Sequence, residues 1–303
     1  MGKDRFERSL IMRILIIGAA GMLGHKLYQV YRERYDVYAT TRQPYSAYAR
    51  YGIFDENRII SGTDADNFDT LIRAVGQVKP DVIINCVGII KQLKASKDPI
   101  PSIRINSLLP HQLADLSAAA HARFIHISTD CVFNGQSSMY KEDTPSDAED
   151  LYGRTKYLGE VDYPHALTLR TSIIGRELST RSGLVEWFLS NPANSTVKGF
   201  RQAIYTGFTT LALAEIMAEI IDNHPELNGL YQVSSEPINK YDLLHLVKDA
   251  FDVNINIEPD DNMRIDRSLD STKFRETTGF QPPAWENMIQ AMASDPTPYE
   301  NWK

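Results

Sequence analysis

The feature that most constrains this chain is a short apolar run followed by three spaced glycines. The segment Arg13–Ile17 reads RILII, which predicts a strand buried on both faces of a sheet. Gly18, Gly21 and Gly24 follow it with the spacing G-x-x-G-x-x-G, and apolar residues then recur at helical spacing. A strand, a glycine turn and a helix in this order let the backbone approach a pyrophosphate closely. We therefore predict a dinucleotide-binding turn, with a tight turn between packed elements as the alternative.

Strand-like and helix-like segments alternate through the first half of the chain. YDVYATTR, DVIINCVG, RFIHIS and ALTLRTS read as further strands, separated by helical segments such as NFDTLIRAVGQVKP and SLLPHQLADLSAAAHA. Such alternation predicts right-handed β-α-β units and a Rossmann-like, doubly wound parallel sheet, an α/β fold. After about residue 171 the pattern loosens, so we expect a smaller C-terminal α/β lobe that binds substrate. The predicted division is a polar extension (1–11), a dinucleotide-binding domain (12–170) and mainly substrate lobe (171–303), with some segments returning to the first domain.

The overall composition limits the kinds of partner. The 303 residues carry a formal net charge of -7, without the basic surplus of a nucleic-acid binder, and their apolar runs are too short to span a membrane. Two cysteines give no disulfide framework, which favours a reducing, cytoplasmic location. The seven histidines show no metal-ligand spacing, so we expect no metal site.

The end of the second predicted strand bears on the choice of cofactor. An NAD-type site usually carries Asp or Glu there, which binds the ribose 2′-hydroxyl. This chain has Thr40, Thr41 and Arg42 instead, and a guanidinium can pair with a 2′-phosphate. We therefore expect NADPH as cofactor, with NADH possible. The alternative is that Arg42 is a solvated loop residue.

A second pattern combines three side chains suited to carbonyl reduction. Thr129 ends the strand-like RFIHIST, and Tyr152 and Lys156 follow with i, i+4 spacing on one helix face. A neighbouring ammonium and a cationic nicotinamide favour the phenolate, so we expect the pKa of Tyr152 to fall from about 10 toward working pH. Tyr152 would then donate a proton to a carbonyl oxygen that receives hydride, with Thr129 hydrogen-bonded to the same oxygen. A bare Tyr-x-x-x-Lys is also common on exposed helix turns, which is the alternative interpretation.

With these motifs the sequence resembles the extended short-chain dehydrogenase/reductase family, and within it the dTDP-4-dehydrorhamnose reductases. The resemblance rests on GAAGMLG, PDVIINCVG, STDCVFNG, YGRTKYLGE, LRTSIIG and DRSLDSTKFRETTGFQPPAWENMI. It implies that Thr129, Tyr152 and Lys156 are the catalytic set, that Asp64 contacts the adenine and that Asn106 supports the active site. The predicted cofactor-binding residues are Gly18, Gly21, Met22, Leu23, Gly24, Arg42, Asp64, Ala65, Cys86, Val87, Gly88, Asn106 and Lys156.

The chain departs from the family pattern where the sugar is expected. Cys131 stands where the family usually has tyrosine, and Lys91 lies in GIIKQ where the family usually has small residues. Cys131 is interpreted as a small packed residue, with a reactive thiol as the alternative. Arginine forks suit a diphosphate, although each one can equally form a surface ion pair. The predicted substrate-binding residues are Lys91, Asp130, Cys131, Arg201, Gln202 and Arg267.

The leading hypothesis is an NADPH-dependent reductase of a nucleotide-linked 4-keto-6-deoxysugar, a small-molecule partner, acting as a possible homodimer. A sugar-nucleotide epimerase on the same scaffold is the closest alternative. A 4,6-dehydratase is disfavoured because Thr129 is followed by Asp130 and Cys131, without the glutamate that such enzymes carry. A non-catalytic, NADP-binding regulatory subunit like that of methionine adenosyltransferase is a further alternative.

Three other residues are interpreted as structural. His126 lies inside an apolar strand and is expected to be a satisfied core histidine, not a base. Trp187 and Trp285 are expected to be core aromatics and not platforms for base stacking.

Overall fold

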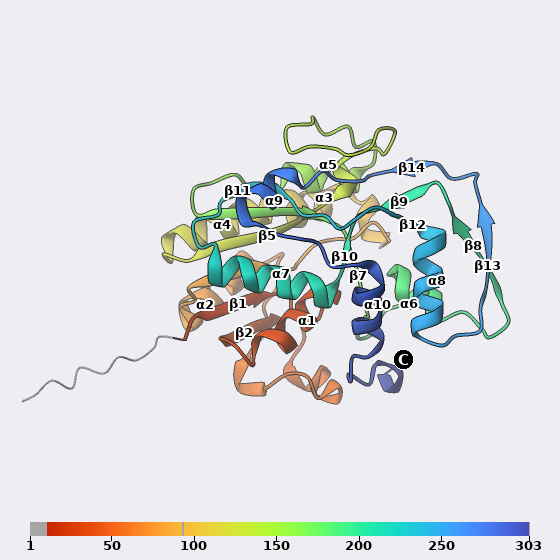
Figure 1. The fold of residues 1–303 in the computed structure, drawn as a ribbon. Helices are drawn as coiled ribbons and strands as arrows, with labels where there is room; N and C mark the ends of the chain where they lie inside the picture. Colours follow the sequence, from red (N-terminus) through yellow and green to blue (C-terminus); the bar gives the residue numbers. More distant parts are fainter. Residues whose placement is uncertain (1–10, 93, 303) are drawn as a thin grey trace, which may run out of the picture.

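A computed structural model describes residues 11–92 and 94–302, and its centre is a seven-stranded parallel sheet (Figure 1). The spatial order is β3–β2–β1–β4–β5–β6–β11, so the winding direction reverses between β1 and β4. Ligands bind beyond the carboxyl ends of the strands at such a reversal. The predicted Rossmann-like fold is therefore confirmed. The strands are β1 (Arg13–Ile17), β2 (Asp36–Thr41), β3 (Ile59–Ser61), β4 (Val82–Asn85), β5 (Arg123–Thr129), β6 (Ala166–Thr171) and β11 (Gly229–Gln232).

Alternate side chains of each central strand pack into two different layers. Ile14 and Ile16 of β1 belong to an apolar cluster with α1 (Met22–Tyr31) and α7 (Thr210–Asn223). Leu15 and Ile17 belong to a second cluster with α2 (Phe68–Val78) and α4 (Leu109–Ala119). All four strand residues are at most 1% exposed. Burial on both faces explains why β1 is continuously apolar instead of alternating.

The helix before β5 contains a wide turn that carries a predicted site residue. The chain is helical from α3 (Pro99–Ser102) through a π-helical segment η5 (Ile103–Leu108) into α4. Pro110 lies in the first turn of α4, as expected, because proline has no N–H to donate and clashes with a preceding carbonyl. The π-helical segment changes the pattern of hydrogen bonds just before this proline. Such segments occur often at functional sites.

The second half of the chain divides between the main sheet and a smaller group of elements beside it. Strand β11 extends the main sheet next to β6, and α7 covers one of its faces (Figure 1). The smaller elements pair mainly with one another: β8 pairs with β13, and β9 pairs with both β12 and β14. They comprise α6 (Leu184–Leu189), β8 (Thr196–Phe200), β9 (Ala203–Tyr205), β12 (Ile238–Asn239), α8 (Lys240–Ala250), β13 (Asn256–Asp260), β14 (Ile265–Asp266) and α10 (Trp285–Ala293). The remaining elements are β7 (Ile173–Ile174), β10 (Phe208–Thr209) and α9 (Thr272–Thr278).

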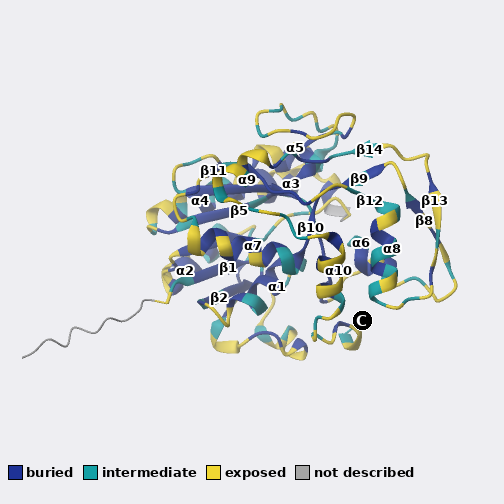
Figure 2. Cartoon of the chain, viewed as in Figure 1, coloured by how far each residue is buried: buried dark blue, intermediate teal, exposed yellow. Residues whose placement is uncertain are grey.

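The burial of the two tryptophans differs from the sequence interpretation in one case. Trp285 is 5% exposed and donates its indole N–H to the carbonyl of Glu236 at 2.7 Å, so it is a core aromatic as predicted. Trp187 is 41% exposed, so its assignment to the core is wrong. Helix α6 is short and buries Val185, Glu186 and Phe188, which leaves Trp187 on its outer face. Figure 2 shows that the central strands are mostly buried, whereas the outer helices carry both buried and exposed residues.

Candidate active site

The glycine turn is shaped by two close backbone approaches. Gly18 has a φ of 92°, which L side chains rarely adopt, and a Cβ there would lie 2.7 Å from Val87 Cγ2. A Cβ on Gly24 would lie 2.2 Å from the carbonyl oxygen of Gly18, so α1 can pack against β1 only if residue 24 is glycine. The protein's own packing therefore requires glycine at both positions.

Gly21 is different, because the protein itself does not exclude a side chain there. A Cβ on Gly21 would make only ordinary contacts, 3.5 Å from Gly18 O and 3.9 Å from Cys86 O, and φ is -74°. Gly21 is the N-cap of α1, which has no side-chain cap and no acidic residue in its first turn. Helix N-terminal N–H groups without a side-chain cap attract anionic oxygens. The turn therefore fits a pyrophosphate, with Met22 and Leu23 in the first turn of the helix.

The end of β2 places Arg42 beside a carboxylate. The Arg42 guanidinium lies 3.6 Å from Asp64 Oδ2, and the Arg42 side chain is 71% exposed. Thr40 Oγ1 accepts a hydrogen bond from the Gly18 N–H at 3.0 Å, which connects the end of β2 to the glycine turn. Ala65 packs against the apolar cluster on the α2 side of the sheet. Arg42 and Asp64 are thus neighbours at the strand edge that the glycine turn also occupies.

The loop after β4 is held in place by Asn106 of the π-helical segment. Asn106 Oδ1 accepts from the Ile89 N–H at 2.9 Å, and Asn106 Nδ2 donates to the Ile89 carbonyl at 3.0 Å. Asn106 Nδ2 also lies 3.3 Å from Thr155 Oγ1 on the helix that carries Tyr152. Asn106 therefore connects the loop after β4 to this helix. It also lies beside Gly88, since a Cβ there would be 3.5 Å from Asn106 Oδ1.

The helix α5 (Leu151–Leu158) packs directly against the turn that follows Thr129. Asp150 caps α5 by accepting from the Gly153 N–H at 2.8 Å. A Cβ on Gly153 would lie 2.2 Å from the Cys131 carbonyl oxygen, so glycine at this position allows the close approach. Gly153 is not among the site residues predicted from the sequence. Its place between Tyr152 and Lys156 was the available signal, since glycine inside a helix costs stability unless packing requires it.

Thr129 and Tyr152 come together at the carboxyl end of β5. Thr129 is 8% exposed, and its hydroxyl donates to Asp130 Oδ1 at 3.0 Å. A side-chain hydrogen bond between Tyr152 and Thr129 acts to lower the pKa of the phenol, but burial and the nearby Cys131 and Asp130 outweigh it. The net pKa of Tyr152 is raised, which differs from our expectation. The main reason is that partial burial of the phenol disfavours its charged form.

Lys156 reaches from α5 to the backbone of β5. It is 6% exposed, and its Nζ donates to the carbonyl of Ile127 at 2.7 Å. Burial lowers the pKa of Lys156 to about 8, against a smaller opposing effect of Glu160. His126 Nε2 lies 3.4 Å from the same Nζ. His126 is a fully buried and hydrogen-bonded core histidine, as interpreted from the sequence, but its partner is a predicted catalytic residue.

Several charged side chains surround Asp130. One of them, Lys240, is not among the site residues predicted from the sequence. Burial raises the pKa of Asp130, while Arg267 and Lys240 act to lower it. Arg267 donates through Nε to the Phe133 carbonyl at 2.6 Å, which fixes it beside the turn after Thr129. Lys240 begins α8, and burial lowers its pKa against the attraction of Asp130. In the sequence, Lys240 is marked only by its position at the start of a helix. Its place beside Asp130 could not be predicted because it depends on how α8 docks.

The other predicted substrate residues have partners of their own. Lys91 Nζ forms an ion pair with Asp150 Oδ2 at 2.6 Å, connecting the loop after β4 to the N-cap of α5. Arg201 is half exposed and donates to Asp261 through Nε at 2.9 Å and through Nη2. The carbonyl of Gln202 accepts from the Ile265 N–H at 3.0 Å. In the described residues, Arg267 and Lys91 are thus connected to the elements around Tyr152, whereas Arg201 is paired on the β8–β13 side.

Cys86 and Cys131 are both free thiols. Burial raises the pKa of each thiol to about 12, so both are protonated at neutral pH. Cys131 therefore fits the interpretation of a small packed residue better than that of a reactive thiol.

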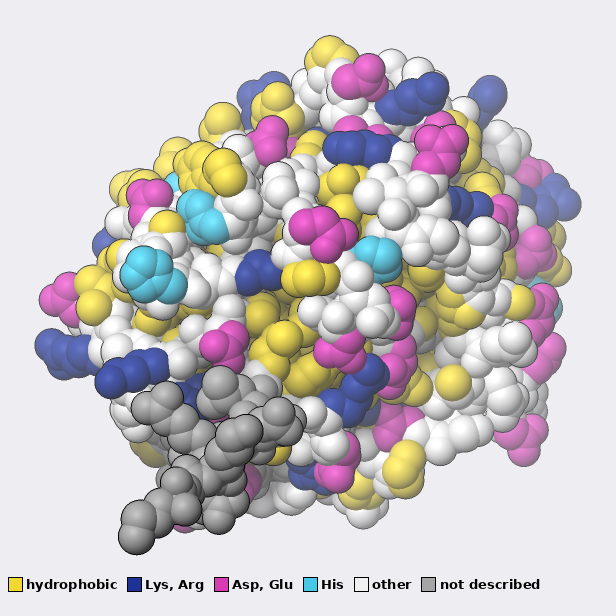
Figure 3. Space-filling model, turned by 60° about the vertical axis from the view of Figure 1, so that its left-hand side comes forward, with side chains coloured by type: hydrophobic (Ala, Val, Ile, Leu, Met, Phe, Trp, Pro, Cys, Tyr) yellow, Lys and Arg dark blue, Asp and Glu magenta, His cyan; other side chains and the backbone are white. Residues whose placement is uncertain are grey.

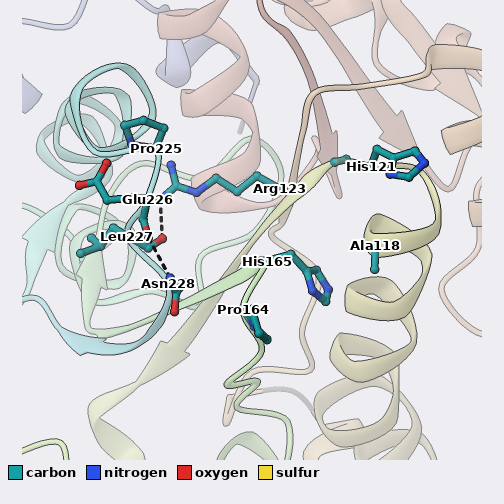
Figure 4. A pocket seen from close by; sticks show the side chains of 10 residues that line it. Ala118, His121, Arg123, Pro164, His165, Pro225, Glu226, Leu227 and Asn228 are labelled. Carbon is teal, nitrogen blue, oxygen red and sulfur yellow. Dashed lines mark hydrogen bonds between the residues drawn. The ribbon is translucent and has the colours of Figure 1, made fainter.

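A surface hollow lies at the opposite ends of the strands (Figure 4). It is lined by the first residue of β5, Arg123, and by His121 and His165 near the starts of β5 and β6. The Arg123 guanidinium already donates to the carbonyls of Ile220 and Leu227, at 3.2 and 2.7 Å. Because this hollow is remote from Thr129 and its main cation is satisfied, we assign the site to the carboxyl ends of the strands.

The chain was compared with known protein families and with curated proteins. The family described as RmlD substrate binding domain matches residues 12–297. The chain belongs to this family. A dTDP-4-dehydrorhamnose reductase of Aggregatibacter actinomycetemcomitans is 25% identical over 92% of this chain and 97% of that protein. The spore coat polysaccharide biosynthesis protein SpsK of Bacillus subtilis (strain 168) is 29% identical over 75% of this chain and 74% of that protein.

Two further similarities bear on the fold and on the alternatives. The methionine adenosyltransferase 2 subunit beta of Xenopus tropicalis is 26% identical over 80% of this chain and 72% of that protein. The crystal structure of a dTDP-4-dehydrorhamnose reductase from Bacillus anthracis in complex with NADP aligns with a TM-score of 0.75 at 21% identity, over 93% of this chain and 98% of that one. The resemblance predicted from the sequence motifs is confirmed.

Proposed function

We propose that this protein is an NADPH-dependent reductase of a nucleotide-linked 4-keto-6-deoxysugar, acting in surface polysaccharide or deoxysugar biosynthesis. The observation that carries the proposal is that Thr129, Tyr152 and Lys156 meet at the carboxyl end of β5, with Thr129 and Lys156 buried and Tyr152 partly buried. The glycine turn after β1, which is separated from β5 only by β4, opens at the same edge of the parallel sheet. Membership of the family supports the same reading.

Each residue of the set has a definite role in this reaction. When bound, NADPH supplies the hydride. Tyr152 donates its phenolic proton to the oxygen of the reduced carbonyl, and its raised pKa keeps the phenol protonated across the neutral range. Thr129 hydrogen-bonds the same oxygen and thereby orients the carbonyl. Lys156 would hold the nicotinamide ribose and, when charged, would stabilise the phenolate that remains.

Other residues would position the two ligands. The N–H groups at the start of α1 would hold the pyrophosphate, and Arg42 would pair with the 2′-phosphate. Arg267 and Lys240 offer two cations beside Asp130, which supports binding of an anionic sugar nucleotide. The smaller group of elements from 171 onward would then form the substrate lobe, with β11 and α7 belonging to the cofactor domain.

A screen of NADPH consumption over thymidine-, uridine-, guanosine- and cytidine-linked 4-keto sugars tests the proposal. We expect turnover with at least one of them and a loss of at least about 100-fold in kcat for Tyr152→Phe. Tyr157→Phe is the matched control, because Tyr157 lies on the same helix and is 43% exposed. Undiminished turnover in Tyr152→Phe would remove this residue as the acid.

The alternatives are separated by the same screen. An epimerase would interconvert sugar nucleotides without net consumption of NADPH. A regulatory subunit would give no turnover with any sugar nucleotide and would bind a protein partner tightly. The meeting of Thr129, Tyr152 and Lys156 at one strand end favours an enzyme, since a cofactor sensor has no use for a positioned proton donor.

We also propose that the protein is a cytoplasmic homodimer. No helix in the described part of the chain is long and apolar enough to cross a bilayer. Charges of both signs are interspersed on the face shown in Figure 3. The exposed apolar side chains of α3, η5 and α5 would form the contact; they are Ile100, Ile103, Leu108, Tyr157 and Leu158. Light scattering is expected to give twice the chain mass, and that of one chain for the Ile103→Glu, Leu158→Glu double variant.

A further inference from the structure

A chain of buried polar groups connects the end of β4 to Lys156. Asn85 Nδ2 lies 3.2 Å from His126 Nδ1, and His126 Nε2 lies 3.4 Å from Lys156 Nζ. Asn85 and His126 are each 1% exposed and Lys156 is 6% exposed. The three groups therefore interact without competition from bulk water, and such buried networks are sensitive to which atom carries each proton.

The orientation of Asn85 fixes the tautomer of the histidine. Asn85 Oδ1 accepts from the Val87 N–H at 3.0 Å, so the NH₂ group of Asn85 is the one that faces His126. An NH₂ group only donates, so His126 Nδ1 must accept, and a neutral imidazole then carries its proton on Nε2. Burial and the nearby Lys156 and His111 lower the pKa of His126 well below its usual value, which keeps the ring neutral.

The ring proton of His126 therefore points at the nitrogen of Lys156. An N–H group that faces an ammonium is repelled by it, whereas the same N–H donates a hydrogen bond to a neutral amine. The lysine nitrogen keeps its own donor bond to the carbonyl of Ile127 in either state. We propose that His126 is a positioning residue that favours the neutral form of Lys156 through the tautomer that Asn85 imposes.

The other charged groups around this network act on it in known directions. Glu160 favours the ammonium of Lys156, but it is already engaged by Ser128 at 2.6 Å and by the Arg170 guanidinium at 2.7 and 2.9 Å. His111 acts on His126 and is hydrogen-bonded to Tyr163 and to the carbonyl of Leu158. His126 is thus the group that presents a donor directly to the lysine nitrogen.

The consequence for catalysis rests on the proposed function. Lys156 stabilises the phenolate only while it is charged, so the reaction should lose activity at alkaline pH once Lys156 becomes neutral. Burial already lowers the pKa of Lys156 to about 8, and a donor facing its nitrogen moves the alkaline limit further down. Asn85 is the last residue of β4, at the strand end where the cofactor is expected. A change at this strand end is therefore transmitted to Lys156 through the His126 ring alone.

The tautomer is tested directly by ¹⁵N NMR of histidine-labelled protein, with the His126 signals assigned by their loss in His126→Phe. We expect an unprotonated Nδ1 and a protonated Nε2 in the wild type. Asn85→Asp should move the ring proton from Nε2 to Nδ1. The reason is that a carboxylate accepts from Nδ1–H, which leaves the Nε2 lone pair facing Lys156. A protonated Nδ1 in the wild type would overturn the proposal, and this measurement needs no substrate.

The effect on Lys156 is measured by titrating the ¹³Cε signal of labelled lysine and by the alkaline limb of kcat/KM. Asn85→Asp should move the titration midpoint of Lys156 and the alkaline limb of kcat/KM upward by about one pH unit. At a pH above the wild-type alkaline limb this is about a tenfold gain in kcat/KM. Asn228→Asp, on the surface, adds the same charge as a control and should move neither. In the Asn85→Asp, His126→Phe double variant the shift should largely disappear. A full shift in the double variant would show that the carboxylate acts through space, and the proposal would then be wrong.

The two readouts separate this proposal from the proposed function. If no sugar nucleotide is reduced, the lysine titration still reports whether His126 controls Lys156. If turnover is normal but Asn85→Asp leaves the lysine titration unchanged, the positioning role fails and the reductase assignment stands.

Discussion

Replacing Lys156 by methionine should abolish turnover and yet leave the fold at least as stable at neutral pH. The pKa of Lys156 falls from 10.5 to about 8 on folding, chiefly because burial disfavours the ammonium. Each pKa unit corresponds to about 1.4 kcal/mol, so keeping this lysine charged inside the protein costs about 3 kcal/mol at pH 7. Methionine fills similar space without charge, but it leaves the Ile127 carbonyl without its 2.7 Å donor, which costs about 1–3 kcal/mol. The expected net gain is about 0–2 kcal/mol.

The stability difference between Lys156→Met and the wild type should depend on pH in a definite direction. Between pH 8 and pH 10.5 the unfolded chain binds more protons at this lysine than the folded protein does, so the wild type gains stability from this group as the pH rises. The destabilisation is fully present below pH 8 and absent above pH 10.5. Lys156→Met lacks this gain, so its advantage over the wild type should shrink by about 2.5 kcal/mol between pH 7 and pH 10.

Urea unfolding of both proteins at pH 7 and pH 10 measures this difference, because pH effects of all other groups cancel between them. Lys141→Met, at an exposed loop position, is the control and should show no such change between the two pH values. An advantage of Lys156→Met that is the same at pH 7 and pH 10, or a variant less stable than the wild type by several kcal/mol at pH 7, would refute the reasoning.

Four further variants follow from the packing and the charges. Gly24→Ala should destabilise the protein by more than about 2 kcal/mol in urea unfolding, since its Cβ would meet Gly18 O at 2.2 Å, whereas Gly21→Ala should keep its stability and lose NADPH affinity by fluorescence titration. Glu160→Gln removes the carboxylate that pairs with Arg170, which is 1% exposed, and should cost about 3–5 kcal/mol in the same unfolding assay. Arg42→Ala should raise the KM for NADPH about tenfold and leave the KM for NADH unchanged, if the guanidinium binds the 2′-phosphate.

The elements that form the cofactor half were predictable because each one satisfies its own local pattern. β1 is apolar throughout since both faces are covered, and α1 begins where the glycines end. Long-range pairing was less visible. The edge strand β3 is only three residues long, and β11 joins the sheet next to β6 from far along the chain, so neither placement follows from local periodicity.

The same distinction applies to the candidate site. Tyr152 and Lys156 were found because they share one face of one helix, a property that five consecutive residues of the sequence contain. The direction of the Tyr152 pKa was not predictable, because it depends on how closely α5 packs against the Cys131 carbonyl. Lys240 was missed for a similar reason, since its charge meets Asp130 only after α8 docks.

The sequence by itself determined which side chains this protein can use: a glycine turn with an adjacent helix start, a phenol and an amine one turn apart, and an arginine where an acid is usual. Only the tertiary structure decided how those groups are protonated. A proton's free energy depends on the water, dipoles and charges within a few ångströms, and residues distant in the chain supply these, as Asn85 and His126 do for Lys156.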